Sequence, residues 1–489
     1  MLTLALAWQA WQLDGAPCRA ETAPQVPTSV VVQPGGLTSQ DVAGRAVQAS
    51  ASLSQKRAEL EAANARMQAT RRQLVPQLTV KGSYTRLSPL TTNFGNGFMV
   101  GAGHEGMITT GPCPGPAAGT NCVLDSAGDP VQAGRTSITF PTNNYALNAS
   151  VIIPLSDSLF RFSHALAVAS KDRDAANYAL EAERLKVRSD ARVLYFNWVR
   201  THGQVSIAAQ ACQQTQARLV EAKTAFELGA LSQADVLKVE ALVANALRAL
   251  QDTETGRELA RRQLAIVMDD HAASDYQVGE EVPSADAKDA DLGSDDELVN
   301  GALARRLELK SVEASARSLT HAVASLKVTR APRVDAVGQV DYGNPNQRYF
   351  PPTPVWRVTW SVGLVASWNL SDAYVAGGRV REVVAKREAL LAQGEQVAEG
   401  IAREIAGAQA AVKSARAALA AADVNLGAQQ EGYRVASEAF ALGKVTATDL
   451  VDAESDLFNA RLGLLDGRID MAIALIRLEH ALGNDGPGR

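Results

Sequence analysis

Aromatic residues are scarce in this chain of 489 residues. Phe, Trp and Tyr together make up 5% of the sequence, whereas 46% of it is hydrophobic, so most of the apolar content is Ala, Leu and Val. This composition favours long helices that pack through small side chains. Apolar runs of the roughly 18 residues that a membrane-spanning helix needs are also missing. If the chain spans a membrane, we therefore expect strands to do so.

An excess of positive charge is absent as well. The 48 Lys and Arg are outnumbered by 53 Asp and Glu, which gives a net charge of -5 and argues against a nucleic acid partner. The motifs HExxH and GxSxG do not occur, there is no phosphate-binding P-loop, and the six His are scattered. We therefore predict no enzyme activity, no cofactor and no metal site.

Cysteine occurs only four times. Cys113 and Cys122 enclose the segment CPGPAAGTNC, where further metal ligands are lacking, so we predict a disulfide and an oxidising compartment. Residues 1–37 are expected to form a signal and N-terminal segment, although Met1 to Trp8 lacks the usual basic residue. Acylation of Cys18 is the alternative to cleavage near Ala20.

Proline is missing from two long stretches, 155–282 and 355–486. Each has room for two helices of roughly 60 residues. Apolar or small residues recur there at alternating steps of four and three, as in a coiled-coil seam. In the second stretch these residues are Ile401, Ile405, Ala408, Val412, Ala415, Leu419, Ala422, Leu426, Tyr433, Ala436 and Phe440.

The same seam occurs twice, at an offset of 214 residues (443 − 229), which reveals an internal duplication. In each copy a glycine, Gly229 or Gly443, is followed by a hydroxyl residue three positions before an Asp. This pattern predicts a helix end at the glycine and a capping box that opens a return helix. Each copy is therefore expected to be a long helical hairpin with its tip at that glycine.

Segments of period-two alternation precede each hairpin and predict strands. They lie at Leu78 to Tyr84 and Tyr145 to Ile153 in the first copy, and at residues 334–342 and 358–364 in the second. Their lengths suit strands that cross a bilayer at a tilt. The segment from Leu87 to Asn144, rich in Gly, Pro and Thr, is expected to be a loop.

The duplicated motif and the strand-to-helix joints, Val151 to Asp157 and Ser367 to Asp372, resemble the TolC-like outer membrane efflux proteins. The resemblance runs from about Thr38 to Gly483. It implies a mainly α fold with a membrane β-barrel. Duplicated units of two strands and a long α-hairpin would form a homotrimer with a 12-stranded barrel and a long α-helical periplasmic barrel.

We divide the chain accordingly into two structural repeats. The first repeat covers 38–270, with a helix, strands at 76–86 and 145–154, and a hairpin at 157–270. An acidic linker follows at 271–294. The second repeat covers 295–484, with a helix, strands at 332–342 and 357–369, and a hairpin at 372–482.

The resemblance also implies a function and partners. The trimer would be a channel in the outer membrane, in contact with its lipid and with a long periplasmic portion. It would export substrates of a tripartite efflux pump or a type I secretion system. Its partners would be a periplasmic adaptor (membrane fusion protein) and an inner-membrane pump of the RND, ABC or MFS type. The alternative is a periplasmic coiled-coil adaptor or scaffold without a pore. A scaffold would need no strands, and adaptors have one long hairpin per chain instead of two.

Two acidic positions match the family's periplasmic entrance, Asp449 and Asp452. Because they are three residues apart on one helix, both can face the same side. Asp449 also fits a capping box, as Asp235 does in the first copy, so capping alone can explain it. The first-copy counterpart of Asp452 is Lys238, and three copies of Asp452 would form an acidic constriction. A solvated surface pair is the competing interpretation.

The turn residues at the two tips are the candidate adaptor contacts. Where some family members have a basic residue two after the turn glycine, this chain has Val445, so gating is expected to rest on packing or on Lys238 and Lys444. Simple turn chemistry would equally explain the residues at the tips. The candidate contacts are Gly229, Ala230, Leu231 and Ser232 in the first hairpin, and Gly443, Lys444, Val445 and Thr446 in the second.

Overall fold

The computed structural model describes residues 32–100, 106–114, 119–229, 231–272, 275–282 and 294–484. The chain divides into two compact units. One contains residues 66–168 and 320–384 and carries the strands, and the other contains most of the helical residues. Cys18 and the expected cleavage site near Ala20 lie outside the described residues. None of the helices in these ranges has an apolar stretch long enough to cross a membrane.

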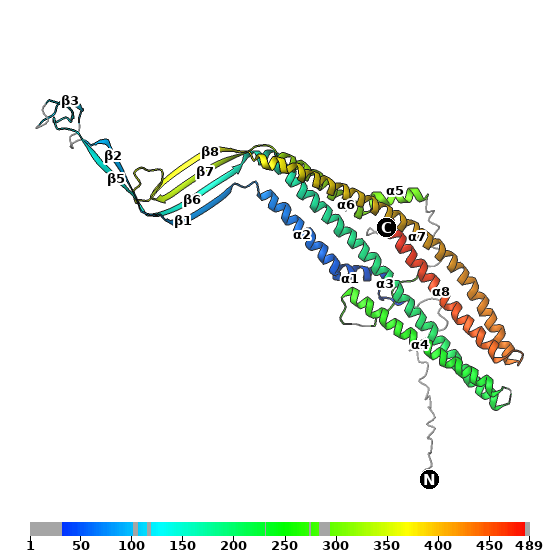
Figure 1. Ribbon diagram of the computed structural model, residues 1–489. Coiled ribbons are helices and arrows are strands. Elements are labelled where there is room, and N and C mark those ends of the chain that lie inside the picture. The colour runs from blue at the N-terminus through cyan, green and yellow to red at the C-terminus, as the bar shows by residue number, and fades with distance from the viewer. Residues whose placement is uncertain are drawn as a thin grey trace, which may run out of the picture. The chain divides into compact units, whose positions relative to one another are not determined.

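The strand-bearing unit contains a four-stranded antiparallel sheet in the order β1-β6-β7-β8 (Figure 1). Its strands are β1 (Gln77–Arg86), β6 (Asn143–Pro154), β7 (Arg333–Asn344) and β8 (Arg357–Ser367). The two halves of the chain contribute two neighbouring strands each, and β6 pairs with β7 at the centre. The duplication is thus visible in the sheet itself.

The expected loop between Leu87 and Asn144 is wrong, because this segment contains four strands. They are β2 (Leu90–Val100), which pairs with β5 (Gln132–Phe140), and β3 (Thr109–Pro112), which pairs with β4 (Asn121–Leu124). Sequence alternation did not reveal them, since large apolar residues do not recur at every second position in these segments.

The helical unit is built on two hairpins (Figure 1). The first joins α3 (Phe162–Glu227) to α4 (Gln233–Met268), and the second joins α7 (Leu370–Ala441) to α8 (Ala447–Ala481). Their lengths are 66 and 36 residues, and 72 and 35 residues. The return helices are shorter than the roughly 60 residues for which each stretch has room, because the proline-free stretches also contain part of the acidic linker and β8.

Four shorter helices complete the described helical structure. They are α1 (Ser39–Ala49), α2 (Ala51–Arg72), α5 (Asp295–Arg305) and α6 (Leu307–Val328), and a short π-helical segment, Asp157–Arg161, precedes α3. The predicted seam is confirmed by burial of Ile401, Ile405, Val412 and Leu419 in one core cluster. In the first hairpin Trp198 and its neighbours pack against α1, α4 and α8.

Candidate functional site at the hairpin tips

Both hairpin tips turn through a glycine with a left-handed backbone, Gly229 at φ 71° and Gly443 at φ 67°. At the second tip the Gly443 N–H donates to the Phe440 carbonyl and the Lys444 N–H to the Ala439 carbonyl, both at 2.9 Å. This pair of bonds is a Schellman motif, which satisfies carbonyls at the helix end. The Gly229 N–H donates to the Phe226 carbonyl at 2.9 Å, whereas Ala230 lies outside the described residues.

The return helices begin with the predicted capping boxes. The Thr446 hydroxyl and N–H both donate to Asp449 Oδ2 at 2.8 Å, and the Asp449 N–H donates back to Thr446 Oγ1 at 3.3 Å. Ser232 and Asp235 repeat this arrangement in the first hairpin. The hydrogen bonds from the Thr446 backbone and side chain lower the pKa of Asp449, so its carboxylate remains charged well into the acid range.

Asp452 differs from Asp449 in having no described partner. It is exposed on the second turn of α8, and none of the hydrogen bonds or ion pairs among the described residues involves it. Its first-half counterpart, Lys238, donates from Nζ to Thr448 Oγ1 of α8 at 2.7 Å. The structure therefore brings Lys238 next to the start of α8, where it links the two hairpins near their tips.

Two exposed leucines at the tips escaped the sequence analysis. Leu228 is 80% exposed and Leu442 is 68% exposed, although each directly precedes the turn glycine of its hairpin. Among the other described turn residues, Ser232, Lys444 and Thr446 are exposed, and Leu231 and Val445 are half-buried. The duplication could have pointed to both leucines, since they occupy equivalent positions at the 214-residue offset (442 − 228).

Polar contacts join the two hairpins at several levels above the tips. Arg218 of α3 donates to Ser437 Oγ at 2.7 Å and to Tyr433 Oη at 3.3 Å, both on α7. Further along, Arg192 of α3 pairs with Glu479 of α8 at 2.7 Å. The sequence could not indicate these pairs, because their register depends on how one hairpin lies against the other.

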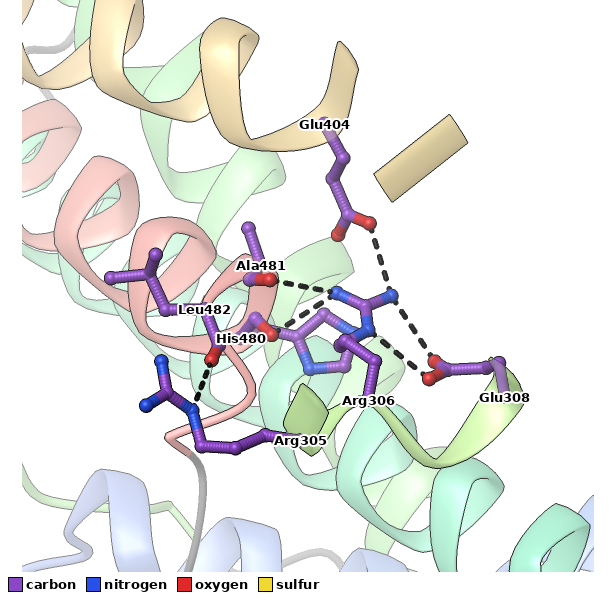
Figure 2. Close-up of polar contacts among 7 residues, drawn as sticks. All are labelled: Arg305, Arg306, Glu308, Glu404, His480, Ala481 and Leu482. Carbon is purple, nitrogen blue, oxygen red and sulfur yellow. Dashed lines mark hydrogen bonds and ion pairs between the residues drawn. The ribbon is translucent and has the colours of Figure 1, made fainter. Parts of the chain in front are cut away.

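Two arginines at the junction of α5 and α6 form hydrogen bonds with the C-terminal end of α8 (Figure 2). Arg306 is 8% exposed, donates to the carbonyls of His480 and Ala481 at 3.2 Å, and pairs with Glu308 and Glu404. Arg305 donates to the Leu482 carbonyl at 3.1 Å. Guanidinium groups thus satisfy the free carbonyls at the C-terminus of α8.

Cys113 and Cys122 form a disulfide with a Cα–Cα distance of 5.0 Å, in the β3–β4 segment far along the sequence from the hairpin tips. In the part of the chain that the structure describes, no group of three or more His, Cys, Asp or Glu could hold a metal ion.

Comparisons with known proteins place this arrangement in a family. The family model of outer membrane efflux proteins matches residues 42–268 and 298–484, most of the chain. A comparison with curated proteins found no match. Among solved structures, the Campylobacter jejuni CmeC outer membrane channel is 14% identical with a TM-score of 0.69, covering 96% of this chain and 91% of that one.

Two further structures are similar in the same way. The open state of the Neisseria gonorrhoeae MtrE outer membrane channel is 16% identical, with a TM-score of 0.67 and 96% of each chain covered. A membrane protein from Pseudomonas aeruginosa is 17% identical, with a TM-score of 0.70 and coverage of 96% of this chain and 97% of that one. At these identities the likeness establishes the fold, which confirms the expected TolC-like architecture.

The family match carries the functional conclusion. It implies a homotrimer that works with an efflux pump, and its members are channels rather than enzymes. The chain therefore belongs to the outer membrane efflux protein family, and it is an outer membrane efflux channel of tripartite systems with a periplasmic helical extension.

Proposed function

We propose that three copies of this chain form one passage whose periplasmic entrance is lined by the hairpin tips and narrowed by Asp452. The edges of the four-stranded sheet support the trimer, since β1 and β8 each pair on one side only within the chain. Exposed strand edges invite pairing with another chain. Joining β1 of one copy to β8 of the next would leave no edge unpaired.

The apolar side of the sheet supports contact with lipid. Val80, Ala149, Val340 and Trp360 lie in register across all four strands, and Trp360 is 69% exposed. Near one end of the strands the rings of Tyr84, Tyr145, Trp356 and Tyr342 form a contact chain in this order, with centroid distances of 5.0, 6.1 and 4.8 Å. Aromatic clusters at strand ends are typical of the interface between membrane and water.

The acidic side chains at the tips are the main support for the proposed channel entrance. The carboxylate of Asp449 accepts hydrogen bonds in its capping box, whereas Asp452 is exposed and has no hydrogen bond or ion pair among the described residues. Around a threefold axis, three Asp452 carboxylates would attract cations and hold back anions. Asp449 would add charge to the same entrance, because its lowered pKa keeps it ionised.

The exposed tips would receive a periplasmic adaptor, which connects the channel to an inner-membrane pump of the RND, ABC or MFS type. Leu228 and Leu442 supply apolar surface that a single chain leaves in water, and burying one leucine contributes about 1.5–3 kcal/mol. The turn residues beside them, Gly229 to Ser232 and Gly443 to Thr446, would form the rest of the contact.

Single-channel recording of the purified protein in planar bilayers tests the entrance. We expect small, cation-selective openings from the wild type. Asp452→Ala is expected to enlarge them or to weaken their selectivity, most clearly at low salt, where charges are least screened. The matched control is Asp423→Ala, which removes an exposed aspartate from α7 far from the tip. Equal conductance and selectivity in the wild type and in Asp452→Ala would contradict the proposed acidic entrance.

Site-specific photocrosslinking in cells tests the adaptor contact. A crosslinking residue at Leu442 is expected to capture a periplasmic protein with a helical hairpin, identified by mass spectrometry. The same residue at Val424, an exposed position of α7 away from the tip, serves as the control. Equal capture at both positions would contradict docking at the tips.

A further inference from the structure

A cavity of about 280 Å³ lies within the helical unit between α3, α4 and α8. Four alanines, Leu242 and Phe458 form its apolar wall. Its polar groups are Glu454, Ser455 and Thr215, together with two asparagines. The cavity is close in size to the smallest pockets that hold organic ligands, and it combines an apolar wall with a few polar groups, as such pockets do.

Glu454 is the charged group of this cavity. It is 6% exposed, and its Oε1 is buried without a hydrogen-bond partner among the described residues. Burying a carboxylate that lacks a partner is costly. The obvious partners are engaged elsewhere, since Arg218 bonds to α7 and Arg461 donates to Gln210 at 3.4 Å. Glu454 Oε1 therefore has no hydrogen-bond partner in the described part of the chain, and the same side chain lines the cavity.

The open side of the cavity is formed by two equivalent residues of the duplication. Asn245 of α4 and Asn459 of α8 are separated by the repeat offset of 214 residues (459 − 245), and both are exposed. Their carboxamides provide neutral acceptors at the rim, while Glu454 provides the only acidic side chain among the lining residues. The two repeats thus contribute matching rim residues but a single charge.

We propose that this cavity binds a small organic ammonium ion, with the ammonium on Glu454 and a short apolar group against Leu242 and Phe458. An ammonium supplies the hydrogen-bond donors that Glu454 Oε1 lacks, together with a positive charge. The apolar wall and the single carboxylate suit this ligand better than a divalent metal ion, which prefers several oxygen ligands.

The protonation of Glu454 gives the binding a pH dependence. Burial raises its pKa to about 7, against the opposing effect of Arg218 on α3 and Arg461 on α8. The residues that α4 contributes to the lining are uncharged. Because only the carboxylate form binds an ammonium ion tightly, the affinity is expected to increase from pH 6 to pH 8.

Calorimetric titration of the full-length trimer in detergent with benzylammonium chloride tests the proposal. The wild type is expected to bind one ion per chain at pH 8. Glu454→Gln is expected to weaken binding roughly tenfold or more, since a charge-assisted hydrogen bond is lost. The control variant is Glu240→Gln at the equivalent position of the first hairpin, where Glu240 is solvent-accessible and paired with Lys223. It is expected to bind as the wild type does.

Three results would overturn the proposal. They are equal binding by the wild type and by a Glu454→Gln variant with native helix content, equally tight binding of neutral benzyl alcohol, or no binding to the folded wild type at pH 8. Because the readout is binding and not conductance, the outcome is independent of whether Asp452 forms the channel entrance.

Discussion

The two hairpins have the same turns but different charges. Both tips combine a left-handed glycine with a capping box, Ser232 with Asp235 in one and Thr446 with Asp449 in the other. One turn further on, Lys238 in the first hairpin corresponds to Asp452 in the second. Backbone requirements have thus kept the turns alike after duplication, whereas the neighbouring side chains have diverged.

The divergence is greatest where the hairpins meet. Glu240 is solvent-accessible and pairs with Lys223 at 3.1 Å, whereas its counterpart Glu454 is buried without a partner for Oε1. The far ends of the return helices differ as well. The positive-φ residue after α4 is Asp269, and the equivalent residue after α8 is Gly483. The comparison teaches that equivalent positions of the repeats perform different tasks.

Removing the buried arginine at the far end of α8 should have the largest effect on stability. Arg306→Ala leaves the carbonyls of His480 and Ala481 without this donor, and an acceptor left unsatisfied in a buried site costs about 1–3 kcal/mol. The ion pairs with Glu308 and Glu404 add little, because these carboxylates are 36% and 41% exposed. We expect a clear drop in the thermal unfolding midpoint. Arg305→Ala, which removes a single hydrogen bond to the Leu482 carbonyl, serves as the control, and an equal loss in both variants would contradict the assigned role of Arg306.

The pH dependence of stability should separate Glu454 from Glu240. Burial raises the pKa of Glu454 from its ordinary value of 4.5 to about 7 in the folded chain. The unfolded chain therefore releases this proton first, and stability falls as the pH rises from 4.5 to 7, by about 3 kcal/mol. Thermal unfolding between pH 4 and pH 8 measures this loss.

Glu454→Gln should remove this loss and make the variant more stable than the wild type at pH 8. Glu240→Gln should leave the slope of the wild type unchanged. An identical pH dependence in the wild type and in Glu454→Gln would show that the buried carboxylate carries no such cost.

The capping boxes should contribute equally in the two hairpins. Ser232→Ala and Thr446→Ala each remove the side chain that accepts from the third residue of the return helix, at a cost of about 1 kcal/mol. Hydrogen exchange of the first turns of α4 and α8 would report both losses. A large difference between the two variants would mean that the tips are not equivalent in energy.

The smallest effect is expected at the ends of the return helices. Asp269 has φ 54°, a conformation that favours glycine, so Asp269→Gly should stabilise the protein by about 0.5–1 kcal/mol. The reciprocal change, Gly483→Asp, should destabilise it, because Gly483 has φ 67°, a conformation that residues with a side chain rarely adopt. Unfolding midpoints that shift in the same direction for both variants would contradict this reasoning.

Local chemistry explains how much of the fold the sequence predicts. The capping boxes and turn glycines are set by residues within six positions of one another, and the seam of Ile401, Ile405 and Val412 follows from helix periodicity alone. The strands from β2 to β5 were missed, since their side chains do not alternate between apolar and polar.

Only part of the candidate site could be predicted from the sequence. Asp452 and Lys238 could be named from the duplication, and Leu228 and Leu442 could have been found in the same way. The buried position of Glu454 and the contact of Arg218 with Ser437 depend on the register between hairpins. No pattern within one helix encodes that register, because it is decided by packing between helices that are far apart in the sequence.

The central claim is that the second hairpin supplies the charge of the channel entrance, and the reversal potential in asymmetric KCl tests it most directly. The account predicts a cation-selective wild type, a shift towards anions in Asp452→Lys, and unchanged or stronger cation preference in Lys238→Asp. Identical reversal potentials for the wild type and Asp452→Lys, from channels of normal conductance, would contradict it.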